Sequence, residues 1–224
     1  MIMVQTLYLV LAALHMQGAS TSLLRLDQAR PSTGLPVGWT VRAVRGQRAP
    51  DVAVKDSSGE RFVRFSGAGR AAWFVHELET RLASAGGRLS WTWRVPVAPA
   101  GADMRANGTD DSALRVFVVF APAGRFERPP RTLFYSVGQV EPLTFERVSS
   151  ASKNLHVFRV APTAASPVWS ETTVDPAADY VRIWGVAAPR IVAVGFMQDS
   201  DQTKSPAVAD VAQLTWRSKD ASTP

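Results

Sequence analysis

Four aspartates stand where loops could use them for chemistry. Asp199 and Asp201 lie between two apolar segments near the C-terminus, and Asp110 and Asp111 stand shortly before a third apolar segment. Calcium takes about 6 to 8 oxygen ligands, commonly from Asp side chains in loops, so Asp199 and Asp201 are candidate ligands of a calcium ion. Two alternatives stay open. The carboxylates could accept hydrogen bonds from backbone N–H groups in a turn, or they could bind or act on a ligand.

Arg115 is the single charged residue of the apolar segment 113–120. A segment that is apolar on both faces predicts a central strand covered on both sides. A buried guanidinium without a partner is unfavourable, so we expect a carboxylate partner from Asp111, Asp199 or Asp201. The pair could be purely architectural, or Arg115 could bind a sugar hydroxyl or carboxylate with its planar fork of donors.

Tryptophans are the second group of candidates, because glycans lay their C–H faces on aromatic rings. The chain has seven, and Trp91 and Trp93 share a strand face with apolar neighbours, which predicts burial. Trp73 and Trp169 are less constrained and are the better candidates for exposed rings. The predicted ligand-binding residues are therefore Asp110, Asp111, Arg115, Asp199, Asp201, Trp73 and Trp169.

Most signatures of enzymes are absent from the sequence. The chain has no Cys, so it has no thiol nucleophile, disulfide or thiolate metal site. The segment HELET at 76–80 lacks the second histidine of a zinc-protease helix and has the pattern of a strand. Glycosidase chemistry needs only two carboxylates about 5 to 10 Å apart. A hydrolase that pairs Asp110 or Asp111 with Asp199 or Asp201 therefore stays open, and no catalytic residue is assigned.

Short strands must position these residues. From residue 38 onward, apolar side chains recur with a period of two between Gly, Pro, Asp and Ser, which is typical of all-β proteins. The pattern predicts a two-sheet antiparallel sandwich or jelly roll, of the galactose-binding-like or lectin-like kind. Strands are predicted at 39–45, 51–55, 60–66, 71–79, 88–96, 113–120, 131–137, 154–161, 190–197 and 208–216.

One short helix is predicted at 175–185. Asp175 can cap its N-terminus, Pro176 suits the first helical position, and Gly185 can end it in a left-handed conformation. Its apolar side should pack on the sandwich as a lid.

The chain divides into a leader, one domain and a tail. Residues 1–20 combine an apolar stretch with small residues, as in a secretory signal peptide, although a buried helix or a retained membrane anchor stays open. Residues 35–217 form the predicted single domain, and residues 218–224 form a polar tail. We expect a periplasmic or extracellular protein with no stable membrane span once the signal is removed.

The formal net charge is +6 and the isoelectric point is about 10.3. The basic residues are nearly all Arg and are scattered, with no block of five or more like charges. This pattern predicts a solvated basic surface and does not indicate nucleic-acid binding.

Several motifs carry a resemblance: WTWRV (91–95), GADMRANGTDDSALRVFVVF (101–120), DYVRIWG (179–185) and PRIVAVGFMQDSDQTKSPAVADV (189–211). Together, over about residues 35–216, they resemble a bacterial family of exported proteins known as domain of unknown function 3047. The resemblance implies export and a β-sandwich similar to carbohydrate-binding jelly rolls, with no known reaction. This chain has MQDSDQT where the family is expected to have MTDTDNT, and VADV where it is expected to have YGDI. These changes keep the acids but would alter a shared ligand pocket.

We expect these features to combine in an exported β-sandwich that binds a glycan or another cell-envelope ligand through loops at one end of the sheets. A carboxylate-dependent glycan hydrolase or lyase is one alternative. A protein-interaction module is the other. Calcium is the only cofactor that the residues suggest.

Overall fold

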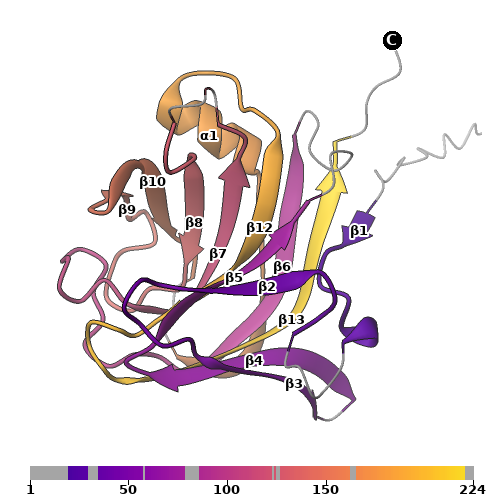
Figure 1. Cartoon of the computed structure of the whole chain (residues 1–224), viewed down its shortest axis with the longest axis vertical. Coiled ribbons are helices and arrows are strands. Elements are labelled where there is room, and N and C mark those ends of the chain that lie inside the picture. Colours follow the sequence, from indigo (N-terminus) through magenta and orange to yellow (C-terminus); the bar gives the residue numbers. More distant parts are fainter. Residues whose placement is uncertain are drawn as a thin grey trace, which may run out of the picture.

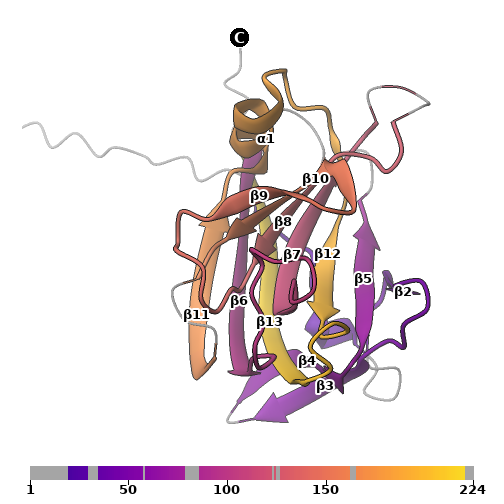
Figure 2. The same cartoon turned by 90° about the vertical axis from the view of Figure 1, so that its left-hand side faces the viewer.

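Two β-sheets face each other across an apolar core in the computed structural model (Figures 1 and 2). The structure describes residues 20–29, 35–57, 59–78, 86–122, 124, 127–161 and 165–219. Both sheets contribute to one buried cluster, as expected for a sandwich whose inner faces interdigitate. The predicted all-β, two-sheet fold is confirmed.

Sheet A has the strand order β11-β6-β13-β4-β3, and β1 also pairs with β13. Its strands are β1 (Ser20–Ser22), β3 (Asp51–Ser57), β4 (Glu60–Ala68), β6 (Gly87–Val97), β11 (Ser166–Val174) and β13 (Pro206–Ser218). The alternation predicted for β6 is present. Leu89, Trp91 and Trp93 are buried in the core, while Ser90 and Thr92 lie on the outer face.

Sheet B has the order β2-β5-β12-β7-β8-β10-β9. Its strands are β2 (Trp39–Ala43), β5 (Ala71–Glu77), β7 (Ser112–Phe120), β8 (Thr132–Ser136), β9 (Glu146–Ser149), β10 (Ser152–Arg159) and β12 (Ile191–Asp199). The described pairs of both sheets are antiparallel except for β8 and β10, which run parallel. A parallel pair needs a crossover, and here the chain makes it through β9.

The central strand β7 is covered on both sides, as its apolar sequence predicts. On its inner face Val116 and Val118 join the core between the sheets. On its outer face Phe117 joins a second cluster with Met104, whose loop folds over this end of sheet B. The second cover is therefore a loop and aromatic side chains, not another layer of secondary structure.

The predicted helix is α1 (Pro176–Trp184). The Asp175 side chain accepts a hydrogen bond from the Ala178 N–H at 3.1 Å, and Gly185 ends the helix at φ 68°. Tyr180 is buried and packs on Phe120 with ring centroids 4.6 Å apart. The helix lies across one end of the sandwich, opposite the end where β12 turns into β13 (Figures 1 and 2).

The core begins earlier in the chain than the predicted domain. A short 3-10 helix, η1 (Leu26–Gln28), follows β1, and Leu23, Leu24 and Leu26 are buried in the core cluster. At the other end, β13 includes Ser218, and Lys219 pairs with Asp175 at 3.0 Å. The described part of the domain therefore extends beyond residues 35–217 on both sides.

The strands β1, β9 and β11 lie outside every predicted segment. Residues 1–19 of the predicted signal and residues 220–224 of the predicted tail lie outside the described residues. Within the described ranges, no helix has the length and apolar character to cross a membrane.

Candidate functional site

The two aspartate loops meet at the end of sheet B that lies away from α1. The strands β7 and β12 are antiparallel neighbours, and Ser112 at the start of β7 pairs with Asp199 at the end of β12. This register places the residues before β7 beside the turn that follows β12. We call Asp110, Asp111, Arg115, Asp199 and Asp201 the acid cluster.

Arg115 is 6% exposed and is held by two carboxylates of this cluster. One of its terminal nitrogens donates to Oδ1 of Asp110 at 2.7 Å, and the other donates to Oδ2 of Asp199 at 3.3 Å. The prediction of a carboxylate partner is confirmed for Asp199. The closer partner, Asp110, was not among the three acids predicted. Arg147 also pairs with Asp110, at 2.5 Å.

Asp111 has a different role from its neighbour. Its carboxylate accepts hydrogen bonds from the N–H and hydroxyl of Thr203, both at 2.7 Å, and from the N–H of Gln202 at 3.3 Å. The Gln202 side chain in turn accepts from the Asp110 N–H at 2.9 Å. These bonds tie the loop before β7 to the β12–β13 turn, so Asp111 holds together the two loops that carry the acids.

Three carboxylates of the cluster lie close enough to hold a cation. Asp111, Asp199 and Asp201 each offer one oxygen, and these oxygens lie within 4.8 Å of one another. The pKa of Asp199 is raised to about 7, mainly because the carboxyl is buried; the charge of Arg115 lowers it, and the charges of Asp201 and Asp111 raise it. Oxygen ligands of this kind suit calcium, and binding would require Asp199 to be deprotonated.

Trp91 and Trp93 are more buried than Trp73 and Trp169, as predicted, but Trp73 and Trp169 do not lie near each other. Trp91 and Trp93 are 1% and 4% exposed, whereas Trp73 and Trp169 are half-buried. Trp73 is on β5 of sheet B, and Trp169 is on β11 of sheet A. The two rings therefore belong to different sheets and cannot line one site.

Trp169 is part of a packed charge cluster on the outer face of sheet A. The guanidinium of Arg94 lies 4.5 Å from the ring centroid of Trp169, and it donates to the fully buried Asp210 at 2.7 Å. Arg64 also donates to Asp210, at 2.6 Å. With Arg94 over its ring, Trp169 contributes to the packing of this cluster.

Trp73 lines an open groove on the outer face of sheet B. Its ring packs against Phe117 and Phe134 in edge-on contacts, with centroids 5.0 and 5.2 Å apart. This Trp73 groove has a volume of about 570 Å³, and its lining residues are Arg42, Ala43, Trp73, Val75, Glu77, Phe117, Val119, Pro129, Pro130, Thr132, Leu155, Val192 and Ala193. An exposed ion pair between Arg42 and Glu77, 2.7 Å long, stands at the groove.

Gly195 allows the aromatic floor of the groove to form. It lies on β12 between Val75 and Phe117, which are its register partners. A Cβ at this position would come within 2.1 Å of the Phe74 carbonyl oxygen and 2.5 Å of the Phe117 ring. The missing side chain therefore lets the Phe117 ring lie across β12 toward Trp73.

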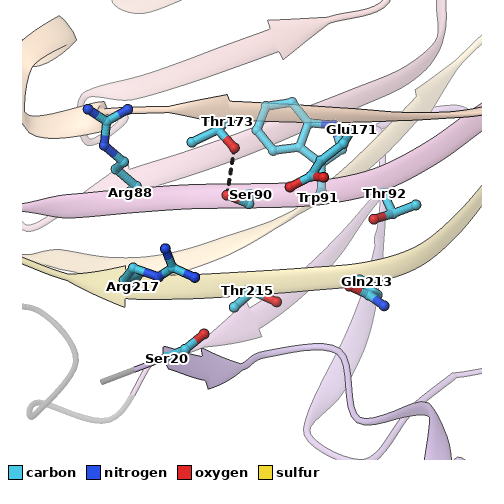
Figure 3. Close-up of a pocket in the computed structure, with 10 residues that line it drawn as sticks. All are labelled: Ser20, Arg88, Ser90, Trp91, Thr92, Glu171, Thr173, Gln213, Thr215 and Arg217. Atoms are coloured by element: carbon cyan, nitrogen blue, oxygen red, sulfur yellow. Dashed lines mark hydrogen bonds between the residues drawn. The ribbon is translucent and has the colours of Figure 1, made fainter. Parts of the chain in front are cut away.

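A second groove, more polar, lies on the outer face of sheet A (Figure 3). It has a volume of about 350 Å³ and is lined by Ser20, Arg88, Ser90, Trp91, Thr92, Glu171, Thr173, Gln213, Thr215 and Arg217. We call it the polar groove. Side chains from β6, β11, β13 and β1 line it.

The sequence names all five residues of the acid cluster, but only the fold places the loop before β7 beside the β12–β13 turn. Neither groove is predicted from the sequence, although Trp73 is a predicted ligand-binding residue. The sequence contains one indication of each groove, the alternation of side chains in a strand that lines it. Trp73, Val75 and Glu77 alternate with inward residues in β5, as do Arg88, Ser90 and Thr92 in β6. This alternation does not show which strands lie next to β5 and β6, and residues of those neighbouring strands form the rest of each groove.

Comparison with solved structures finds sandwiches of low sequence identity. The Family 11 carbohydrate-binding module of the cellulosomal cellulase Lic26A-Cel5E of Clostridium thermocellum is 9% identical, with a TM-score of 0.48 over 90% of this chain and 96% of that chain. The Family 29 carbohydrate-binding module CBM29_1 from Piromyces equi is 9% identical, with a TM-score of 0.42 over 92% and 95%. The family 11 xylanase from Neocallimastix patriciarum is 11% identical, with a TM-score of 0.45 over 80% and 91%. No curated protein matches the chain.

The motifs of the acid cluster and of β6, α1 and β12 all fall inside one family match. The family model described as "Protein of unknown function (DUF3047)" matches residues 37–215, which is most of the 224-residue chain. The resemblance seen in the motifs is confirmed, and this chain belongs to the DUF3047 family.

Proposed function

We propose that this protein binds a glycan in the Trp73 groove. The observation that carries the proposal is the half-buried Trp73 ring, which Phe117 and Phe134 fix in place within an open, mostly apolar groove. A ring that is already ordered before binding loses little conformational entropy when a ligand stacks on it.

The chemistry of the groove fits a sugar. Trp73, Val75 and Phe117 offer apolar surface to the C–H faces of a pyranose ring. Arg42 and Glu77 offer donors and acceptors to its hydroxyls, and their ion pair is exposed, with 60% and 75% of the side chains accessible. An exposed ion pair contributes little stability, so both groups can exchange partners at small cost. The volume of about 570 Å³ is in the usual range for small-ligand sites.

This proposal moves the ligand away from the acid cluster. The predicted loop site contains carboxylates that are already engaged with Arg115, Thr203 and backbone N–H groups. Neither groove includes a member of the acid cluster. In this proposal the acid cluster does not contact the ligand. It holds together the loops at one end of sheet B, the sheet that carries the Trp73 groove.

A carboxylate-dependent glycan hydrolase or lyase is the second candidate. One observation favours it: the raised pKa of Asp199, about 7, beside two other carboxylates within 4.8 Å. A carboxyl that keeps its proton near neutral pH can act as a general acid. Turnover of a polysaccharide that is lost in Asp199→Asn would support this candidate against binding alone.

The proposed location is the periplasm or the outside of a bacterial cell, on the strength of the signal-like leader and the family resemblance. The proposed partner is accordingly a polysaccharide of the envelope or of the surroundings. A protein partner is the third candidate, and it is favoured if no glycan binds.

The test is binding of the mature protein to a panel of neutral polysaccharides that includes β-glucan, xylan and mannan, by affinity electrophoresis and calorimetry. Trp73→Ala is expected to weaken binding by at least about tenfold. The pair variant Arg42→Ala/Glu77→Ala should also weaken binding, and we expect it to fold as the wild type does because both side chains are exposed. Trp169→Ala, on the other sheet, is the matched control and should bind as the wild type does.

Three results would count against the proposal. Equal losses in Trp73→Ala and Trp169→Ala would point to a general effect on folding. Unchanged binding in both groove variants would place the glycan elsewhere. No binding to any polysaccharide of the panel would leave the Trp73 groove without the proposed ligand and favour a protein partner.

A further inference from the structure

Two arginines stand side by side at one end of the polar groove. Arg88 on β6 and Arg217 on β13 are register partners in an antiparallel pair, so their side chains project from the same face of sheet A. Side chains directly opposite each other have Cβ atoms about 4.5 to 5.5 Å apart. Figure 3 shows both guanidinium groups at the same end of the groove.

This arrangement costs stability unless something offsets the charge. Like charges directly opposite each other across a strand pair destabilise a sheet. Within the described ranges, neither Arg88 nor Arg217 forms an ion pair with a carboxylate. Asp175 is near enough to sense the charge of Arg88, but its own ion-pair partner is Lys219, at 3.0 Å. Both side chains are exposed, and their donors are available to a ligand.

Hydroxyl groups continue the groove beyond the arginines. Ser90 and Thr173 are hydrogen-bonded to each other at 2.7 Å, as the dashed line in Figure 3 marks. Thr215 is the register partner of Ser90. These groups both donate and accept hydrogen bonds, as is required to bind the hydroxyls of a sugar.

We infer that the polar groove binds a carboxylate-bearing polysaccharide, with Arg88 and Arg217 holding the carboxylate of a uronic-acid unit and the hydroxyl row holding its neighbours. The planar guanidinium matches a carboxylate with two parallel hydrogen bonds. A bound carboxylate also offsets the charge repulsion between the two arginines. This inference goes beyond the Trp73 groove, because it concerns the outer face of the other sheet and a charged ligand.

The composition of the groove separates this ligand from a nucleic acid. The groove contains Glu171, and its single aromatic residue, Trp91, is 1% exposed. A nucleic-acid site needs many phosphate contacts and exposed rings on which bases stack. Two cations beside a row of hydroxyls suit a uronic-acid chain, whose units carry both a carboxylate and hydroxyl groups.

The test uses polygalacturonate as the probe, with binding measured by affinity electrophoresis and calorimetry at low salt. The groove variant is Arg88→Gln/Arg217→Gln. The matched control is Arg45→Gln/Arg190→Gln, which removes the same two positive charges from exposed positions outside both grooves. We expect the groove variant to lose at least tenfold in affinity and the control to lose less than twofold. Equal losses would mean nonspecific attraction to a basic protein and would overturn the inference.

Three further measurements make the result specific. Inorganic polyphosphate and dextran sulfate are parallel probes, and equal or tighter binding of either through the same arginines would overturn the assignment to carboxylates. Thermal melting of the groove variant should show unchanged or higher stability, because the repulsion is removed, so a loss of binding will not come from unfolding. Neutral β-glucan binding should stay unchanged in the groove variant and depend on Trp73, which separates a failure here from a failure of the proposed function.

Discussion

Trp73 and Arg115 lie in one row across the outer face of sheet B, with Met197 between them as the register partner of both. Adjacent strands are about 4.8 Å apart, so the backbones of Trp73 and Arg115 are about 10 Å apart across the sheet. Phe117 of the groove lies two residues from Arg115 on β7. The acid cluster thus fixes the strand register at the end of the sheet where the groove begins. Changes in the cluster are expected to act on the groove through stability and not through ligand contact.

Replacing Arg115 with Met is expected to destabilise the protein by about 3 to 5 kcal/mol, because it leaves the carboxylates of Asp110 and Asp199 buried without this partner. Urea unfolding measures the change. The control is Arg105→Met, which removes an exposed pair with Asp103 and should leave the midpoint nearly unchanged. Similar midpoints for the two variants would mean that the buried cluster does not hold the loops together.

Stability should depend on pH through Asp199. Its pKa in the folded protein is raised from 3.8 to about 7, so between these values the folded state binds more protons than the unfolded state. The stabilising contribution of the protonated carboxyl is complete below about pH 3.8 and is lost as the pH rises through about 7. In a chelating buffer, the free energy of unfolding of wild type relative to Asp199→Asn should fall by about 2 to 4 kcal/mol between pH 4 and pH 8. A constant difference over this range would contradict the assignment.

Calcium is expected to raise the melting temperature of the wild type at pH 7.5 if the acid cluster holds the ion. A ligand that binds only the native state stabilises by about 2.7 kcal/mol at a hundred times its dissociation constant. The effect should be smaller at pH 5, where binding must displace the proton of Asp199. Asp201→Asn should abolish the effect, because Asp201 completes the set of three carboxylates. Identical melting curves with saturating calcium and with a chelator would refute the calcium prediction.

Replacing His156 with Phe is expected to stabilise the protein, most of all in acid. Both ring nitrogens of His156 are buried without a hydrogen-bond partner among the described residues, while the ring packs on Phe158 at 4.8 Å. Burial lowers the pKa of His156 below its usual 6.5, so the unfolded state binds the proton more readily and stability is lost as the pH falls below about 6.5.

The Phe ring keeps the contact with Phe158 and removes the unpaired nitrogens, which should contribute about 1 to 3 kcal/mol. Urea unfolding of wild type and variant at pH 5 and pH 7.5 checks this. A variant that is less stable at pH 5 would show that His156 makes a favourable polar contact there.

Local sequence patterns determined the fold class and most of the elements. The alternation in 88–96 and the Asp-Pro start and Gly end of the helix act over a few residues, and each reappears in the structure as β6 and α1. The need of Arg115 for a carboxylate also follows from its apolar neighbours alone, because desolvation of a charge is costly wherever the strand lies. The polar segments that became β9 and β11 lacked such a pattern, and only pairing with neighbouring strands makes them part of a sheet.

The partners were decided only in three dimensions. A strand pattern says which face a side chain occupies, but strand order and register decide which residues of other strands stand beside it. Strand order and register made Asp110 the closer partner of Arg115 and placed Trp73 and Trp169 on different sheets. They also placed Arg88 opposite Arg217, which is far away in the chain. The sequence by itself thus determined a β-sandwich with a buried charge, and the pairing of distant strands decided where a ligand could bind.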